Sequence, residues 1–319
     1  MGKRCAVIVL NYNGKHLLPA CLDSLALQQN ADIEVIIVDN NSSDGSAAFV
    51  AEKYPKVKFL ALDKNYGFSG ANNFALRDAL ARGFDFAMLL NNDTFADPHM
   101  VAEMIATMET DPRVAVVCPK IFFASRPDMI WYAGGGFNFW TGRTQHRGWK
   151  QIDRGQFDDK LDITQATGCA MMVRCSAMRK AGLLDEQFFM YAEDTDWSLR
   201  FAELGYLLRF APKARVWHID GATTVKLVGK GSESLRQFLS TRNMVFVARK
   251  HARWWQIPTY AIVFGISHVA LFTALRLWRR DFPALWAIYR GLFQGLQTRL
   301  EGAAGGSKKI DSMGVQTLR

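Results

Sequence analysis

The sequence predicts an α/β protein, with a mostly parallel sheet covered by helices on both faces and followed by C-terminal helices that associate with a membrane. Three observations predict this architecture. Apolar runs of strand length alternate with amphipathic stretches along the first 90 residues, which is typical of buried parallel strands. Polar clusters follow directly after three of these runs. A 22-residue stretch near the C-terminus, residues 254–275, contains no Lys, Arg, Asp or Glu.

The composition and the charge distribution narrow the class of protein. The chain has 319 residues, of which 49% are hydrophobic and 22% charged, so it can bury a sizeable core. Residues 249–319 hold 11 Lys and Arg against three acids, whereas residues 1–248 hold 28 against 27. A nearly neutral body disfavours a nucleic-acid binder. A basic end that is also rich in Trp favours contact with an anionic membrane surface.

The cysteines and the N-terminus indicate the compartment. The five cysteines form no CxxC pair, and their odd number and scatter fit a reducing compartment better than a disulfide framework. The apolar run at residues 5–10 is short for the core of a signal peptide. We therefore expect a location on the cytoplasmic face of the cell membrane.

The elements can be assigned in chain order. The expected strands of the first half are residues 5–10, 34–38, 57–62 and 86–90. A helix is expected from Asn65 toward Arg82. Residues 121–165, rich in Gly, Trp and Arg, are expected to form long loops with short strands. Further regular structure is expected at residues 170–174, 194–204 and 232–252, the last two with helical spacing.

Two apolar segments close the chain. About 20 apolar residues suffice to span a bilayer, but Gln256, Pro258 and His268 dilute the run at residues 254–275. Basic residues flank both of its ends, so the positive-inside rule gives no orientation. Residues 282–300 follow with apolar side chains at helical spacing. We favour in-plane or hairpin attachment over a true span, and a buried helix of a soluble protein is the alternative.

Polar side chains stand where the expected strands end. Asn11 and Asn13 follow the first strand, and Asp39 follows the second. Parallel sheets bind ligands beyond the carboxyl ends of their strands, so the Asp39 carboxylate could accept hydrogen bonds from a base or ribose. A cap for the next helix is the alternative. The stretch from Asn65 through Gly67 to Asn72 opens a helix, where glycines can let backbone amides approach a phosphate; simple capping explains them equally well.

Two acidic motifs are candidates for chemistry. Asp93, after Asn91 and Asn92, could bind a divalent cation that also holds a diphosphate, with an Asx turn as the alternative. Glu193, Asp194 and Asp196 stand at a helix start after an aromatic run, which is more acid than a cap needs. A carboxylate beside an aromatic wall can serve as a general base, because partial desolvation raises its proton affinity. His218 alone would be a core or surface histidine.

Together these motifs resemble the family 2 glycosyltransferases, which are inverting nucleotide-sugar enzymes of the GT-A fold. The resemblance covers about residues 4–253, and six motifs occur in the family's order: residues 7–13, 37–45, 65–72, 90–93, 167–174 and 188–197. Within the family the chain is most similar to the rhamnosyltransferase branch. It lacks the Gln-x-x-Arg-Trp motif of processive polysaccharide synthases.

The resemblance implies roles for particular residues. It makes Asp39 a ligand of the donor's base, Asp93 the metal-binding acid, Asp194 the base that deprotonates the acceptor hydroxyl, and His218 a second metal or diphosphate contact. The first acid of the family's D-x-D element is replaced by Asn91, so that donor contact must be neutral. Further donor-site residues are expected at Asn11, Asn13, Asn65, Gly67, Asn72 and Asn92. The residues expected around the acceptor or behind the base are Glu193, Asp196, Trp197 and Arg242, although a helix-surface role for Arg242 and Asn243 is equally open.

The implied reaction is transfer of a sugar, L-rhamnose from dTDP-rhamnose, to a hydroxyl of a lipid-linked saccharide in cell-surface polysaccharide synthesis, with Mg²⁺ or Mn²⁺ as cofactor. A catalytic domain is then expected over residues 1–253, with a nucleotide-binding half (1–120) and an acceptor half (121–253). Residues 254–301 would be the membrane-associating segment and 302–319 a flexible tail.

Three alternatives remain at this point. The first is a polyprenyl-phosphate glycosyltransferase. The second is a non-catalytic, membrane-attached protein that binds nucleotide sugars, but it predicts damage at Asp93 or Asp194, and both are intact. The third is a sugar-phosphate nucleotidyltransferase, which should have a Gly- and Arg-rich loop where this chain has residues 11–14. The sequence does not fix the oligomeric state.

Overall fold

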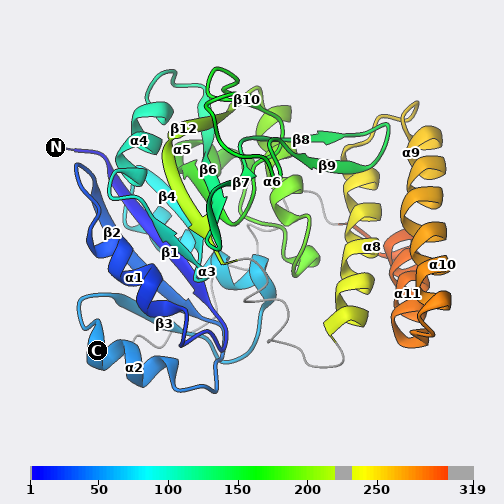
Figure 1. Ribbon diagram of the computed structural model, residues 1–319, viewed down its shortest axis with the longest axis horizontal. Helices are drawn as coiled ribbons and strands as arrows, with labels where there is room; N and C mark the ends of the chain where they lie inside the picture. Colours follow the sequence, from blue (N-terminus) through cyan, green and yellow to red (C-terminus); the bar gives the residue numbers. More distant parts are fainter. Residues whose placement is uncertain (1, 220–231, 301–319) are drawn as a thin grey trace.

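A computed structural model describes residues 2–219 and 232–300 and shows an α/β domain beside a unit of C-terminal helices (Figure 1). The expected tail, residues 302–319, lies outside the described residues. The expected fold class is confirmed, because a mixed sheet with helices on both faces forms the centre of the larger part.

The large sheet has ten strands within the described part of the chain. The strands, including the separate pair β8 and β9, are β1 (Arg4–Asn11), β2 (Asp32–Asp39), β3 (Lys58–Ala61), β4 (Phe86–Asn91), β5 (Thr94–Ala96), β6 (Val114–Phe123), β7 (Arg126–Tyr132), β8 (Gly135–Asn138), β9 (Arg143–His146), β10 (Asp162–Ile163), β11 (Ala170–Arg174) and β12 (Leu207–His218). The main path runs β10-β12-β6-β11-β4-β1-β2-β3, with β5 paired to β12 and β7 to β6. Strands β4, β1, β2 and β3 are parallel, whereas β11 is antiparallel to both its neighbours.

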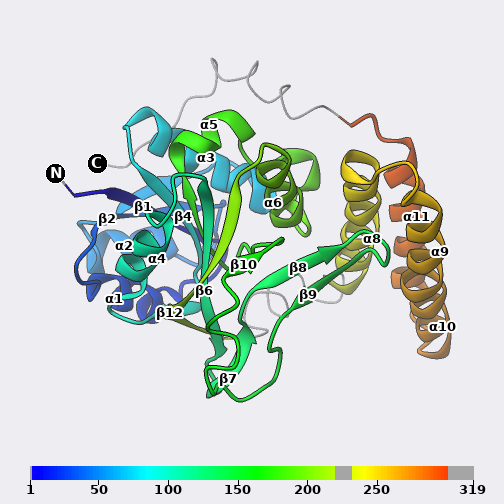
Figure 2. The same ribbon diagram turned by 90° about the horizontal axis from the view of Figure 1, so that it is seen from above.

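The four apolar runs of the first half are confirmed as β1 to β4. Strands β1 and β4 are buried along most of their length, β2 in its second half, and the edge strand β3 mainly at Leu60. The helices of this domain are α1 (Leu18–Ala26), α2 (Ser46–Lys53), α3 (Gly67–Ala81), α4 (Met100–Met108), α5 (Cys175–Ala181), the 3₁₀ turn η1 (Glu186–Phe188) and α6 (Glu193–Glu203). Figure 2 shows α3, α5 and α6 on one face of the sheet and α1, α2 and α4 on the other. The sequence did not predict β6 and β12, which complete the far side of the sheet.

The C-terminal unit is entirely helical where it is described. It contains α8 (Ser232–His251), α9 (Ile257–Phe264), the π-helical turn η3 (Gly265–Ala270), α10 (Leu271–Trp278) and α11 (Phe282–Gln297). The segments α9, η3 and α10 form one helix over Ile257–Trp278, and α11 returns alongside it as a helical hairpin. Helix α11 also packs along α8. The β8–β9 hairpin crosses from the sheet to this unit (Figure 2), where Phe137 packs against two small apolar clusters, one containing Phe246 and the other Tyr260.

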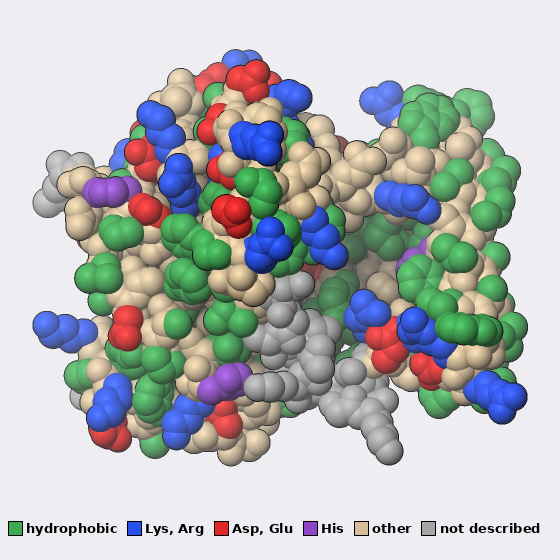
Figure 3. Space-filling view, viewed as in Figure 1, with side chains coloured by type: hydrophobic (Ala, Val, Ile, Leu, Met, Phe, Trp, Pro, Cys, Tyr) green, Lys and Arg blue, Asp and Glu red, His purple; other side chains and the backbone are tan. Residues whose placement is uncertain are grey.

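The outer face of the helical unit is apolar. Figure 3 shows hydrophobic side chains along its outer edge, with Lys and Arg near its two ends. The most exposed large side chains include Trp254, Ile266, Trp278, Trp286 and Phe293, and the fractions for Trp278 and Trp286 are 79% and 64%. Within the described residues, Ile257–Trp278 is the one helix long and apolar enough to cross a membrane.

Candidate active site

The carboxyl ends of three neighbouring strands are joined by polar side chains. In the register of the sheet, Asn11 at the end of β1 lies beside Asp39 at the end of β2. The Asn11 amide Nδ2 donates to Asp39 Oδ1 (2.8 Å), and the Asn92 amide donates to Asn11 Oδ1 (2.9 Å). Asn11 is fully buried, and Asp39 and Asn92 are at most 5% exposed. Asn11 and Asn92 therefore support the Asp39 carboxylate from behind.

The loop after β2 closes around the same carboxylate. Ser42 donates its hydroxyl to Asp39 Oδ1 (2.6 Å) and its backbone N–H to Oδ2 (2.9 Å). Asn13, at a φ of 50°, accepts the Ser43 N–H (2.8 Å) and so joins the end of β1 to this loop. Hydrogen bonds thus connect Asp39, Asn13 and Asn11 at the carboxyl ends of β1 and β2. This is the edge at which sheets of this kind bind ligands.

A residue that we did not predict holds the next loop in place. The Asn40 side chain accepts the Tyr66 N–H (2.8 Å) and donates to Asn65 Oδ1 (2.9 Å). Asn65 in turn accepts the Gly67 N–H (2.8 Å) at the start of α3. Asn40 stood in the quoted motif next to Asp39, but nothing local to it showed that it reaches a loop 25 residues away.

The start of α3 is covered by protein. Gly67 has a φ of 71°, and a Cβ there would lie 2.4 Å from the Phe189 carbonyl, so glycine is required. That carbonyl accepts the N–H groups of Phe68 (2.6 Å) and Ser69 (3.2 Å). This corrects the expectation that these amides are open to a phosphate. Asn72 is also buried and donates to the Phe68 carbonyl (2.9 Å), so its side chain stabilises the first turn of the helix.

Asp93 and His218 form a buried pair, although 124 residues separate them. His218 ends β12 and lies opposite Thr94 of β5, which begins directly after Asp93. The distance from His218 Nε2 to Asp93 Oδ1 is 3.2 Å, and the two residues are 8% and 2% exposed. A buried carboxylate beside an imidazole fits two ligands of a divalent cation. Within residues 2–219 and 232–300, no group of three or more His, Cys, Asp or Glu side chains is placed to hold a metal ion.

The neighbourhood of Asp194 links it to the end of β4. Its Oδ2 accepts the Gly168 N–H (3.0 Å) and its Oδ1 accepts the Thr195 N–H (2.7 Å). The next residue, Cys169, accepts the Asn91 N–H through its carbonyl (2.9 Å). Residues 168–169 therefore lie between the half-buried Asp194 and the strand end that carries Asn91, Asn92 and Asp93.

The two adjacent acids at the start of α6 have raised proton affinities. Burial raises the pKa of Glu193 to about 8, and the neighbouring charge of Asp194 adds to this. Burial also raises the pKa of Asp194, although the N–H groups of Gly168 and Thr195 oppose that effect. Glu193 therefore keeps its proton at neutral pH, which leaves Asp194 as the carboxylate of the pair that can be ionised.

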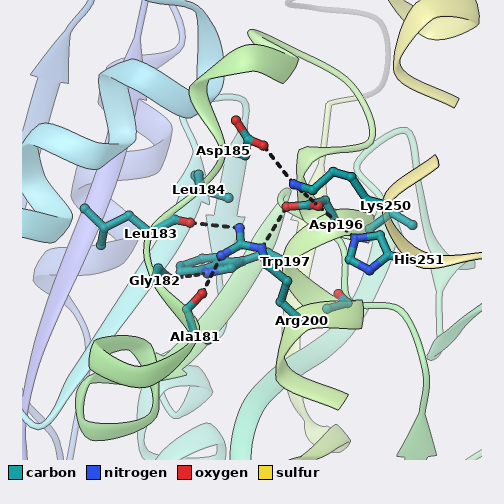
Figure 4. A network of polar contacts seen from close by, with 12 residues as sticks. Ala181, Gly182, Leu183, Leu184, Asp185, Asp196, Trp197, Arg200, Lys250 and His251 are labelled. Carbon is teal, nitrogen blue, oxygen red and sulfur yellow. Dashed lines mark hydrogen bonds and ion pairs between the residues drawn. The ribbon is translucent and has the colours of Figure 1, made fainter. Parts of the chain in front are cut away.

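The third acid, Asp196, has a different role (Figure 4). It is fully buried and contacts two cationic side chains and a histidine: Arg200 Nε (2.9 Å), Lys250 Nζ (2.6 Å) and His251 Nε2 (2.8 Å). Burial alone would raise its pKa, but the hydrogen bond from His251 and the charges of Arg200 and Lys250 outweigh burial and hold the pKa well below its usual range. Asp196 thus joins α6 to α8.

Trp197 and Arg242 both donate hydrogen bonds to backbone carbonyls. Trp197 is fully buried, and its indole N–H donates to the Gly182 carbonyl (2.9 Å), so it is a core residue and not an acceptor contact. The Arg242 guanidinium donates to the carbonyls of Gln187 and Phe188 (2.9 Å each) in the segment before Asp194. This segment has three non-glycine residues at positive φ, namely Phe189, Tyr191 and Ala192. Such conformations cost about 1–3 kcal/mol each and need support from their surroundings.

A groove of about 790 Å³ lies between β7 and the β8–β9 hairpin. Its lining includes Trp131, Trp149, His146 and Gln145. Trp131 also contacts His218 edge to face, with 5.0 Å between the ring centroids, so the groove begins beside the Asp93–His218 pair. Burial lowers the pKa of His146 to about 4, which leaves its imidazole neutral at pH 7.

Comparisons with known proteins agree with this arrangement. The sequence model described as "Glycosyl transferase family 2" matches residues 6–182, more than half of the chain. The N-acetylglucosaminyl-diphospho-decaprenol L-rhamnosyltransferase of Mycobacterium tuberculosis is 25% identical over 297 residues, which cover 86% of this chain and 95% of the relative. The dTDP-rhamnosyl transferase RfbF of Shigella flexneri is 22% identical over 277 residues, which cover 86% and 90%.

Solved structures share the fold. The mannosyltransferase PcManGT of Pyrobaculum calidifontis, in complex with GDP-Man and Mn²⁺, aligns with a TM-score of 0.53 at 17% identity, over 93% of this chain and 88% of that one. This likeness supports the GT-A-type architecture that the motifs predicted.

Proposed function

Because the chain belongs to glycosyltransferase family 2, we propose that it transfers L-rhamnose from dTDP-rhamnose to a hydroxyl of a lipid-linked saccharide, with inversion at the anomeric carbon. The observation that carries this proposal is the placement of the polar groups. Asp39, the Asp93–His218 pair and Asp194 are tied to neighbouring strand ends through Asn11, Asn92 and residues 168–169. The choice of rhamnose as the donor sugar is based on the names of the two rhamnosyltransferase relatives, and the choice of a lipid-linked acceptor on the name of the first.

Each group has one task in the proposed reaction. Asp39 binds the donor's base or ribose as a hydrogen-bond acceptor. Asp194 takes the proton of the acceptor hydroxyl as that oxygen attacks the anomeric carbon from the face opposite the nucleotide. The N–H groups of Gly168 and Thr195 fix the orientation of the Asp194 carboxylate. Glu193, neutral at pH 7, adds no second negative charge beside it.

A divalent cation fits the Asp93 and His218 side chains, and the structural relative from Pyrobaculum calidifontis holds Mn²⁺. When bound, such a cation stabilises the negative charge of the departing diphosphate. A glycoside hydrolase uses a second carboxylic acid to protonate the leaving group. A diphosphate stabilised by a cation would not need that proton, so one carboxylate suffices as the acid–base group here.

The exposed apolar face of α9, α10 and α11 supports attachment to a membrane, and the scattered cysteines favour its cytoplasmic side. Trp278 and Trp286 are exposed on α10 and α11, and Trp254 is exposed just before α9. Exposed arginines stand nearby, Arg279 directly after α10 and Arg290 on α11. Tryptophan side chains favour the membrane interface, and arginines favour anionic headgroups. A protein attached in this way would meet an acceptor that is itself held in the bilayer.

The test uses the full chain with anionic vesicles that contain either N-acetylglucosaminyl-diphospho-polyprenol or polyprenyl phosphate. Separate reactions supply dTDP-rhamnose, UDP-glucose and GDP-mannose with Mn²⁺, and mass spectrometry of the lipid measures the sugar added. We expect a deoxyhexose to be added from dTDP-rhamnose, and we expect NMR of the product to show that the anomeric configuration is inverted. Transfer of another sugar would refute the donor, transfer to polyprenyl phosphate alone would refute the acceptor, and absence of transfer from every donor would refute the function.

A further inference from the structure

One side chain of α8 holds the segment that precedes Asp194. The Asn243 amide Nδ2 lies within hydrogen-bond distance of three backbone carbonyls, those of Phe188 (2.9 Å), Met190 (2.8 Å) and Tyr191 (2.7 Å). The amide nitrogen carries two hydrogens, so at least one of them is shared between two carbonyls. Asn243 is fully buried. Its own Oδ1 accepts a hydrogen bond from Arg242 Nε (2.9 Å), which fixes the orientation of the amide.

The segment held in this way connects both halves of the site. Phe189, Tyr191 and Ala192 adopt positive φ values of 63°, 72° and 63°, a conformation that these residue types do not favour by themselves. The Phe189 carbonyl accepts hydrogen bonds from the N–H groups at the start of α3, next to the loop that Asn40 holds. At its other end the segment leads directly into Glu193 and Asp194. Its conformation therefore sets the position of Asp194 relative to the donor side.

The position of Asn243 depends in turn on α11. Two glycines of α11, four residues apart, lie against the backbone of α8. A Cβ on Gly291 would lie 2.5 Å from the Phe238 carbonyl oxygen and 3.2 Å from the Arg242 nitrogen. A Cβ on Gly295 would lie 2.8 Å from the Val245 Cβ and 3.1 Å from the Arg242 carbonyl oxygen. The two helices thus meet at the turn of α8 that carries Arg242 and Asn243, and any larger side chain would push them apart.

We propose that Asn243 is a positioning residue for Asp194, and that the close contact of α8 with α11 makes the rate of transfer depend on the C-terminal helices. The helical unit is then part of the catalytic machinery as well as an attachment device. This inference rests on the proposed function for its kinetic readout, and the experiment includes a second readout that does not.

The first arm compares glycines of the helical unit in the full chain. Gly291→Ala places a methyl group where the α8 backbone lies, whereas Gly265→Ala is the matched control, because a Cβ on Gly265 meets nothing within 4 Å. We expect Gly291→Ala to lower kcat by about tenfold or more while the Kd for dTDP, which contacts the Asp39 side, changes less than threefold. We expect Gly265→Ala to retain the kcat of the unchanged protein.

The second arm compares two buried amides of α8. Asn243→Ala removes the contacts to the three carbonyls, whereas Gln237→Ala removes an amide that donates to Glu233 of the same helix (2.9 Å). We expect Asn243→Ala to lower kcat by about 10²-fold with the Kd for dTDP nearly unchanged, and Gln237→Ala to have no such effect. Binding of dTDP shows that each variant is folded.

The readout that needs no turnover is amide hydrogen exchange of residues 187–192. We expect exchange in this segment to accelerate at least tenfold in Asn243→Ala and in Gly291→Ala, but not in Gln237→Ala or Gly265→Ala. If the unchanged protein transfers sugar and the Asn243 and Gly291 variants match their controls in kcat and exchange, the inference is overturned and the proposed function stands. If the unchanged protein transfers no sugar, the proposed function fails, and unchanged exchange in the two variants would still overturn the inference.

Discussion

Asp194→Asn is the substitution that tests the chemistry most directly. The amide keeps the shape of the carboxylate but cannot accept the proton of the acceptor hydroxyl. The Asp194 carboxylate accepts one N–H at each oxygen, from Gly168 and from Thr195. An asparagine has a single oxygen, so one of these two N–H groups must lose its acceptor.

The two consequences have different sizes. Loss of a positioned general base slows transfer by about 10²- to 10⁴-fold, which corresponds to about 3–5 kcal/mol in the activation barrier. Loss of one hydrogen bond at a half-buried site costs about 1–3 kcal/mol of folding stability. In a chain of this size that lowers Tm by a few degrees. The variant should therefore remain folded and bind donor while it fails to turn over.

The assay measures kcat for transfer, the Kd for dTDP and Tm for Asp194→Asn, with Glu193→Gln and Asp196→Asn as matched acid-to-amide controls on the same helix. We expect the largest loss of kcat in Asp194→Asn, with donor affinity preserved. An active Asp194→Asn beside a Glu193→Gln or Asp196→Asn variant that is inactive but still folded, as shown by its Tm and dTDP binding, would show that another carboxylate is the base. Full activity in all three would refute the base-assisted inverting mechanism.

Four further results are expected. In the unchanged protein, the pKa of Glu193 is about 8 in the folded state and ordinary in the unfolded state, so the stability that its bound proton contributes is lost as pH rises from about 5 to 8. The Tm of Glu193→Gln should therefore fall less steeply over this pH range than the Tm of the unchanged protein, and equal slopes would contradict the raised pKa. Asp196→Asn leaves buried cations without their carboxylate and should lower the free energy of unfolding in urea by about 3–5 kcal/mol, whereas a loss below about 1 kcal/mol would show that the cluster is not stabilising. Asp93→Ala should abolish the Mn²⁺-dependent part of dTDP binding in calorimetry, with Asn91→Asp tolerated, and donor binding that is indifferent to chelator would exclude the metal role. Replacing both Trp278 and Trp286 with Ser should reduce sedimentation with anionic vesicles more than 0.5 M salt does, because salt screens charge but not apolar burial; unchanged sedimentation would place the membrane contact elsewhere.

The sequence alone predicted the features that local pattern encodes. The apolar runs became β1 to β4, since strands buried on both faces, as β1 and β4 are, must be apolar along their length. The polar residues after those runs had to lie together because the ends of parallel strands share one edge of the sheet, and Asn11 and Asp39 do. The resemblance of the ordered motifs to a known family identified the chemistry, which no single motif would have done.

Only the tertiary structure decided how distant side chains combine. Of three neighbouring acids, it buried Asp196 among cations of α6 and α8, left Glu193 without a cation in contact among the described residues, and gave Asp194 two backbone donors. It also placed Asn243 on carbonyls more than 50 residues earlier in the chain. These pairings depend on how α8 docks on α6 and α11, and docking is fixed by packing between surfaces far apart in sequence. A local sequence pattern does not show which distant surfaces pack together. The sequence could therefore identify the three acids as candidates but could not assign their roles.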